Sequence, residues 1–392
     1  MTDPTLDPGF FQDPYTVYSR LRSTHPVQPM PSGNGGRVSY VITGHTEARE
    51  ALGDPRLSKD TAAFFASRPS RRNLHPAVAE NMLATDPPDH TRLRALVTKA
   101  FTTGAVDRLR PYIDQVTHSL LDRLPVGAKA DLVASLAVPL PVTVISELLG
   151  VPEEDRPDIR RWSTDLFAAG QPERIDTASH AIAGYMTDLI AAKRRQPGNA
   201  LLDALIAARD GDDRLSEEEL VSLAVLLVVA GHETTTNFIG NAVLALLQHP
   251  SALAQLRDNP GKIAGCLDEL LRYDSPLSMA TFRHSTEALT LGGAQIPAGV
   301  PVLVSPGAAN RDPQRFPSPD QLDLARDATG HLAFGHGIHR CLGAPLAKAE
   351  TEIALRALVT RFPDLRLAVP FDDLRWRHTR LMRGLVALPV LT

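Results

Sequence analysis

Apolar residues recur at helical spacing over most of the chain, between about residues 89 and 362. An apolar position every three to four residues is typical of an amphipathic helix, and Gly or Pro marks the segment ends. The pattern predicts helices over residues 91–101, 106–124, 142–149, 175–195 and 201–209. The middle of the chain is therefore expected to be mostly helical.

The longest predicted helix runs from about 216 to 247, shortly before Pro250. Ser216 and Glu219 have the spacing of a capping box, in which two side chains cap the helix start reciprocally. At 1.5 Å per residue the helix would be ~48 Å long, enough to cross a whole domain. Residues 220–230 are almost entirely apolar, so this part is expected to be buried all round.

Strand-type residues cluster at 37–43 and 288–304, and an irregular, Pro-rich stretch covers 305–330. A coil that long inside a domain is uncommon and usually functional. The predicted fold class is mainly α with small β-sheets. No internal repeat or flexible linker divides the sequence, which predicts a single domain over residues 1–392.

Composition narrows the class of protein. Hydrophobic residues make up 43% and charged residues 22% of the chain, as in globular proteins. A net charge of −4 gives no support for a nucleic-acid partner. The two cysteines, Cys266 and Cys341, favour a reducing compartment. The start lacks the features of a signal peptide, and the longest apolar run is about 12 residues, shorter than a membrane span. We therefore expect a cytoplasmic protein without a membrane anchor.

The segment Phe334-Gly-His-Gly-Ile-His-Arg-Cys-Leu-Gly343 carries the strongest chemical signal. Its glycines allow the backbone to fold tightly around the Cys341 sulfur. A helical pattern follows from residue 342, and the start of a helix favours a thiolate over a thiol. A dinucleotide-binding glycine loop is excluded because Arg340 stands where a third Gly is required. Cys266 has no such setting and is interpreted as structural.

This segment resembles the haem-binding loop of the cytochrome P-450 family, Phe-Gly-x-Gly-x-His-x-Cys-x-Gly, at every fixed position. The resemblance implies a haem b cofactor between the long helix and the Cys341 loop, with Cys341 as its axial thiolate and metal ligand. Phe334 and His339 are then haem-binding residues. Other motifs of the family follow in order along nearly the whole chain.

Ala230-Gly-His-Glu-Thr-Thr235 on the long helix resembles the family's groove over the haem. The resemblance implies that Ala230 and Gly231 leave room for O2, and that the catalytic pair Glu233 and Thr234 delivers protons. A zinc helix of the form His-Glu-x-x-His is excluded because the fifth position is Thr236.

Two further motifs resemble parts of the family that hold the haem. His90 and Arg94, together with Arg283 and His339, match positions that contact the two haem propionates. Glu269 and Arg272 match a structural Glu-x-x-Arg pair, which ties its helix to the irregular segment 310–317. Two positions depart from the family: Lys348 replaces a common Arg, and His284 replaces a small residue.

The resemblance implies a monooxygenase that inserts one oxygen atom from O2 into a hydrophobic small molecule, by hydroxylation or epoxidation. The substrate is expected to be a secondary metabolite such as a macrolide, polyketide or terpenoid. Segments 61–85, 165–180, 279–282 and 381–383 would form its pocket. No flavin, NAD or iron–sulfur motif is present, so electrons would come from a ferredoxin and a ferredoxin reductase. Arg92, Lys99, Arg340 and Lys348 are candidate docking cations.

Two alternatives share the haem-thiolate centre. A gas-binding sensor without turnover would not need Glu233 and Thr234. A peroxide-driven peroxygenase usually places other groups above the haem.

Overall fold

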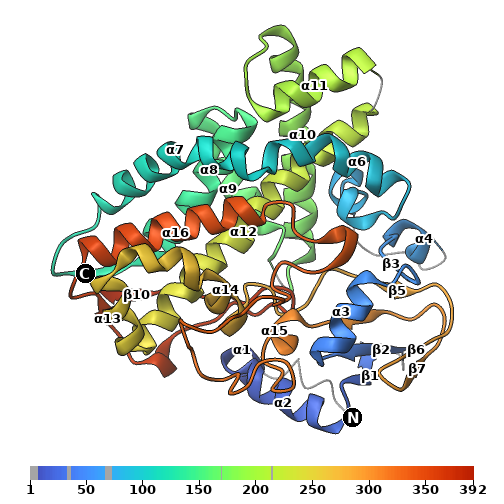
Figure 1. Cartoon of the computed structure of the whole chain (residues 1–392). Helices are drawn as coiled ribbons and strands as arrows, with labels where there is room; N and C mark the ends of the chain where they lie inside the picture. The colour runs from blue at the N-terminus through green and yellow to red at the C-terminus, as the bar shows by residue number, and fades with distance from the viewer. Residues whose placement is uncertain (1–7, 33–36, 67–72, 169, 213–214) are drawn as a thin grey trace. The chain divides into compact units, whose positions relative to one another are not determined.

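The computed structural model describes residues 8–32, 37–66, 73–168, 170–212 and 215–392, and helices dominate it (Figure 1). The helices are α1 (Pro8–Gln12), α2 (Pro14–Thr24), α3 (His45–Gly53), α4 (Thr61–Phe65), α5 (Pro76–Ala79), α6 (Asp89–Thr98), α7 (Thr103–Leu121), α8 (Pro139–Leu149), α9 (Arg156–Asp165), α10 (Pro172–Arg195), α11 (Leu201–Asp212), α12 (Glu217–Gln248), α13 (Pro250–Asp258), α14 (Ile263–Tyr273), α15 (Pro306–Ala309) and α16 (Ala344–Arg361). The mainly helical fold class predicted from the sequence is confirmed.

Strands in the described residues are short and form small sheets. They are β1 (Val27–Ser32), β2 (Arg37–Ile42), β3 (Leu57–Ser58), β4 (Lys129–Asp131), β5 (His284–Ser285), β6 (Leu289–Leu291), β7 (Ala294–Ile296), β8 (Val302–Val304), β9 (Arg366–Leu367) and β10 (Pro389–Leu391). The sheet orders are β1-β2-β8, β4-β10-β9, β3-β5 and β6-β7, and only the β2–β8 pair is parallel among these. The β4-β10-β9 sheet was not predicted, because strands of two or three residues are too short to show an alternating pattern.

The chain forms two compact units. Unit 1 comprises residues 1–58, 114–137 and 234–392, and unit 2 comprises residues 59–113 and 138–233. Both are discontinuous in sequence, and helix α12 contributes its first half to unit 2 and its second half to unit 1. The single domain expected over residues 1–392 stays a prediction.

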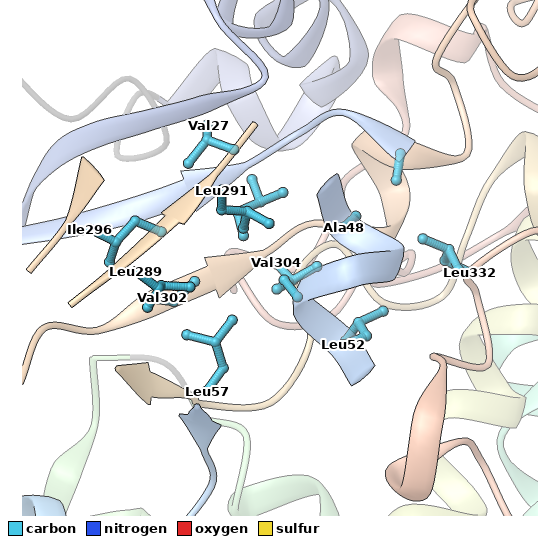
Figure 2. Close-up of a cluster of buried hydrophobic side chains, with 13 residues drawn as sticks. Val27, Ala48, Leu52, Leu57, Leu289, Leu291, Ile296, Val302, Val304 and Leu332 are labelled. Atoms are coloured by element: carbon cyan, nitrogen blue, oxygen red, sulfur yellow. The ribbon is translucent and has the colours of Figure 1, made fainter. Parts of the chain in front are cut away.

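One hydrophobic core of unit 1 joins its sheets to the segment that precedes Cys341. Alternate residues of β6 and β8 point into this core, as the period of two in a strand requires. Leu52 of α3 and Leu332 also contribute to it (Figure 2). The core thus fixes both the end of α3 and the beginning of the Cys341 loop.

The long helix α12 is confirmed with nearly the predicted bounds. The backbone N–H of Ser216 donates to Glu219 Oε2 at 2.8 Å, and that of Glu219 donates to Ser216 Oγ at 3.1 Å, so the predicted capping box forms. The helix is long and apolar enough to cross a membrane by composition, with a mean hydropathy of 1.2 over its most apolar 18 residues. However, 67% of that window is buried inside the protein, as in the core helix of a globular domain.

Candidate functional site

The loop before Cys341 is closed by its own backbone. The Cys341 N–H donates to the Phe334 carbonyl at 2.8 Å, and the Arg340 N–H donates to the Gly337 carbonyl at 3.1 Å. Gly335 and Gly337 have φ values of +71° and +72°, a region that side-chain-bearing residues rarely adopt. The prediction that glycines allow this tight fold is therefore confirmed.

Helix α16 begins later than the sequence pattern suggested. Its first residue is Ala344 and its N-cap is Gly343, so Cys341 lies two residues before the cap instead of at the helix start. The turn formed by Leu342 and Gly343 comes between them. The helix begins after Gly343 because glycine is a good N-cap and a poor interior residue of a helix.

The two cysteines have opposite surroundings. The Cys341 thiol is exposed, whereas Cys266 in α14 is buried, with only 2% of its surface accessible. Burial raises the pKa of the Cys266 thiol to about 11, so this group stays protonated at neutral pH. Of the two cysteines, only Cys341 is exposed, which is consistent with a metal-binding thiolate at this position.

A buried cation accompanies the loop in unit 1. Arg283 is 3% exposed, and its Nη2 donates to the Leu52 carbonyl at 3.4 Å. A buried guanidinium suits an anionic group such as a carboxylate. His339 closes the short 3₁₀ turn Gly337–His339 of the Cys341 loop. Both residues therefore lie on segments that are fixed close to this loop.

A second group of basic residues lies in unit 2. His90 is buried on α6, and Arg94 follows one turn later, as predicted. Burial is the main cause that lowers the pKa of His90, and the positive charges of Arg94 and Lys59 lower it further. Lys59, which sequence reasoning missed, is only 2% exposed. Three basic side chains gathered in this way favour an anionic group such as a propionate.

In the sequence, Lys59 is marked only by its place directly before Asp60-Thr61, a helix-capping pattern. The same pattern occurs at exposed helix starts, so it does not indicate a buried lysine. Its backbone is held by Asp86, whose carboxylate oxygens accept the Lys59 N–H at 3.2 and 3.3 Å. The sequence could not have shown this pairing across 27 residues.

The Glu269–Arg272 pair forms a buried anchor for the irregular segment. The two side chains are 1% and 0% exposed and are joined by hydrogen bonds of 2.6 and 2.9 Å. Arg272 also donates to the carbonyls of Asn310 (3.0 Å) and Pro319 (2.8 Å). Asn310 in turn accepts the Leu332 N–H at 2.6 Å. The predicted tie between this helix and the irregular segment is confirmed, and it continues toward the Cys341 loop.

The predicted groove residues occupy the middle of α12. Ala230 is exposed although most residues of the preceding stretch, 220–229, are buried, so the helix is accessible at this point. A Cβ at Gly231 would lie 3.1 Å from the Ile145 side chain of α8, so close packing between the two helices also favours glycine here. Glu233 is 2% exposed, and the following Thr234 is partly accessible.

The segments expected to line a substrate pocket contain both buried and accessible apolar side chains. Phe64 is buried and Phe65 is 43% exposed, and their rings meet edge to face at 5.0 Å. Residues 67–72 and 169 of these segments lie outside the described residues.

The candidate docking cations differ in their contacts. Lys348 forms an ion pair with Asp268 at 2.5 Å, and Arg92 pairs with Glu219 and Asp89. Lys348 and Arg92 are therefore partly neutralised by acidic residues of this chain, which weakens their predicted role in docking a partner. Arg340 and Lys99 are exposed.

The site residues fit the cofactor that the sequence implied. Unit 1 holds Thr234, Arg283, Phe334, His339 and Cys341, and unit 2 holds His90, Arg94, Ala230, Gly231 and Glu233. In unit 1, the exposed Cys341 and the buried Arg283 suit the thiolate ligand and a propionate of a haem. In unit 2, the basic residues around His90 suit an anionic group such as a propionate.

Comparisons with known proteins point to the same conclusion. The family model described as "Cytochrome P450" matches residues 141–367. Cytochrome P450 107B1 of Saccharopolyspora erythraea is 50% identical over 392 residues, which cover 98% of this chain and 96% of the relative. Mycinamicin IV hydroxylase/epoxidase of Micromonospora griseorubida is 41% identical over 379 residues, which cover 95% and 94% of the two chains. The solved structure of the tirandamycin C-bound P450 monooxygenase TamI is similar with a TM-score of 0.92 and 47% identity over 99% of both chains.

Proposed function

Because this chain belongs to the cytochrome P450 family, we propose that it inserts one oxygen atom from O2 into a hydrophobic secondary metabolite, with Cys341 as the haem ligand. The family consists of haem-thiolate monooxygenases, so the enzyme class and the haem cofactor follow from membership. When bound, haem with a thiolate ligand supplies the activation of dioxygen, because the sulfur donates electron density that promotes O–O cleavage.

The observation that carries the residue assignment is the exposed Cys341 thiol on a loop closed by glycines. Arg283 and His339 in unit 1, and His90 and Arg94 in unit 2, would hold the propionates. Lys59 joins this set because it is buried and its positive charge lowers the pKa of His90. Each would supply a positive charge or an N–H donor to a carboxylate.

Proton delivery is assigned to Glu233 and Thr234. A buried carboxylate within a nearly apolar helix is costly and requires a functional or structural reason. A carboxylate can accept a proton from solvent, and the adjacent hydroxyl can pass one on. This pair is also what favours a monooxygenase over a gas sensor, which has no need to move protons.

The substrate class is inferred from relatives and from the predicted pocket segments. One relative is named for its action on mycinamicin IV, and a solved relative is bound to tirandamycin C. The apolar side chains of Phe64, Met82 and Phe282 are consistent with a hydrophobic guest. Electrons are proposed to come from a ferredoxin and its reductase, and a cytoplasmic location stays a prediction.

Replacement of the proposed ligand tests the assignment. Cys341→His should remove the red-shifted absorption of the reduced carbon-monoxide complex, because imidazole donates less electron density than thiolate does. Cys266→Ser serves as the control and should retain that absorption. The opposite result for the two variants would overturn the assignment.

A binding screen tests the substrate class. The holoenzyme is titrated with a panel that contains mycinamicin IV, tirandamycin C and plain fatty acids, and the change in haem absorption is recorded. Saturable shifts with the metabolites at lower concentration than with fatty acids are expected. A preference for fatty acids would contradict the proposed substrate class.

A further inference from the structure

His232 stands between Gly231 and Glu233 on α12, and the proposed function gives it no role. Its side chain is only 1% exposed, and its Nδ1 lies 2.9 Å from Oγ of Ser163. Ser163 belongs to the last turn of α9 and is fully buried. The other ring nitrogen, Nε2, lies 3.6 Å from Oε1 of Glu233, which is 2% exposed. Ser163, His232 and Glu233 all belong to unit 2.

This geometry selects one tautomer of the His232 ring. If Nδ1 carried the proton, the Nε2 lone pair would face a carboxylate oxygen, and the two would repel each other. If Nε2 carries the proton, its N–H faces the carboxylate and Nδ1 accepts from a donor. The Ser163 hydroxyl is that donor, since it can rotate to point its hydrogen at Nδ1. Of the two neutral tautomers, only this one gives Nδ1 a donor and turns a positive N–H, 3.6 Å away, toward Glu233 Oε1.

We propose that Ser163 is a positioning residue for proton delivery, acting on Glu233 through His232. The hydroxyl holds the imidazole in the Nε2–H tautomer, and the ring then orients the carboxylate beside it. Neighbouring residues on a helix do not normally face each other, so the approach of His232 to Glu233 requires a fixed ring. The inference rests on the proposed role of Glu233 and Thr234.

The position of Ser163 gives this bond a further consequence. α9 ends at Asp165, where the segment expected to line the substrate pocket begins. The Ser163–His232 bond therefore connects this segment to Glu233 through one intervening side chain, that of His232. A substrate that orders the end of α9 would also order the Glu233 carboxylate.

The tautomer can be measured directly on the holoenzyme. The chain is labelled with ¹⁵N-histidine, and ring nitrogen shifts are recorded in the reduced carbon-monoxide complex, which is diamagnetic. The chain has 13 histidines, and the His232 signals are those that disappear in His232→Gln. The wild-type protein should show the Nε2–H form. Ser163→Ala should shift both nitrogens toward a mixture of tautomers, and Ser163→Thr should restore the wild-type values.

Coupling of turnover provides the second readout. The panel compound that binds most tightly serves as the probe substrate, and product formed per reductant consumed is measured together with hydrogen peroxide. Loss of one hydrogen bond in Ser163→Ala should lower coupling roughly fivefold, with probe affinity retained. Ser163→Thr should recover it. Ser222→Ala is the matched control, because the Ser222 hydroxyl bonds the Glu80 carbonyl at 3.0 Å from the same helix α12.

Two reference variants separate the inference from the function on which it rests. Glu233→Gln and Thr234→Ala should each release more peroxide if the pair delivers protons. If they do so while Ser163→Ala changes neither the tautomer nor coupling, the role of Ser163 is wrong and the proposed function stands. If they leave coupling unchanged, the proton-delivery proposal fails. An altered tautomer with normal coupling would also overturn the positioning role.

Discussion

Gly337 lies where the Cys341 loop passes close to the end of helix α3. A Cβ at this residue would stand 2.9 Å from the Leu52 carbonyl oxygen and 3.2 Å from the Gly53 Cα, and φ is +72°. Backbone atoms cannot move aside as the end of a flexible side chain can. The residue therefore keeps the loop and α3 in close contact.

Gly337→Ala should destabilise this contact. The left-handed conformation alone costs alanine roughly 1–2 kcal/mol, and the clash adds to it. Haem content per chain and the melting temperature should both fall. Gly53→Ala is the control from the other side of the contact, because its Cβ would meet only the His336 ring, at 3.7 Å. Equal haem loss in both variants would contradict the explanation.

Glu350 is a buried acid in α16 without an assigned role. It is 1% exposed, and its Oε2 has no hydrogen-bond partner among the described residues. Burial raises its pKa well above the usual value, so the folded protein holds a proton that the unfolded chain releases. Stability is therefore lost as the pH rises above the unfolded pKa, by at most about 1.4 kcal/mol per pH unit.

Glu350→Gln should remove this dependence, since the amide cannot ionise. The variant should be more stable than the wild type at pH 8, and the difference should shrink toward pH 5, as measured by urea unfolding. Glu352→Gln is the control, because Glu352 lies on the same helix and faces Arg356 at 3.6 Å. A pH-independent difference for Glu350→Gln would show that its carboxyl is ionised in the folded protein.

At the scale of elements, Asp268 joins α14 to α16 and to the start of the Cys341 loop. Its carboxylate contacts His331 Nε2 at 3.1 Å and Lys348 Nζ at 2.5 Å. The centre of the Phe334 ring lies 5.8 Å from that of the His331 ring and 5.9 Å from Lys348 Nζ. The hydrogen bond from His331 is the main cause that lowers the pKa of Asp268 far below its usual value, and the hydrogen bond from Lys348 lowers it further.

Asp268→Asn should destabilise the protein by about 1 kcal/mol or less, because Asp268 and Lys348 are both more than one-third exposed to solvent. A depressed carboxyl pKa contributes stability that is present above the unfolded pKa near 4 and is lost as the pH falls below it. The difference from wild type should therefore be fully present at pH 5 and shrink below pH 4. Urea unfolding over this range measures it, and a difference that grows toward acid would contradict the ion pair.

At the scale of the whole molecule, the proposed ferredoxin partner predicts a salt effect. Ferredoxins are typically acidic, so the exposed Arg340 beside Cys341 would speed encounter. First-electron transfer should slow as the Debye length shrinks from ~10 Å at 0.1 M to ~3 Å at 1 M salt. Arg340→Glu should reproduce the slowing at low salt without changing probe binding. Arg92→Glu is a poorer test, because Arg92 already pairs with Glu219.

A reduction rate that depends on neither salt nor Arg340 would mean that the partner docks elsewhere or is not acidic. Stopped-flow reduction by a bacterial ferredoxin distinguishes these outcomes. Lys99→Glu offers a comparison, since Lys99 is exposed in the 3₁₀ turn that follows α6.

The sequence by itself determined the helical fold class, the long helix α12 and the loop around Cys341. These features are local: helical periodicity, the capping box at Ser216 and the spacing of Gly335 and Gly337 depend on neighbouring residues. The Glu269–Arg272 pair was also visible because its members are three residues apart. Strands of two or three residues, such as β9, lie below the length at which a pattern can be recognised.

Only the tertiary structure decided which distant side chains meet. Ser163 and His232 are 69 residues apart, and Lys348 lies 80 residues after its partner Asp268. Each of these side chains looks ordinary in its own segment. Their roles arise from partners that chain folding brings within 3 Å. A hydrogen bond or ion pair across such a separation leaves no periodic signal in the sequence.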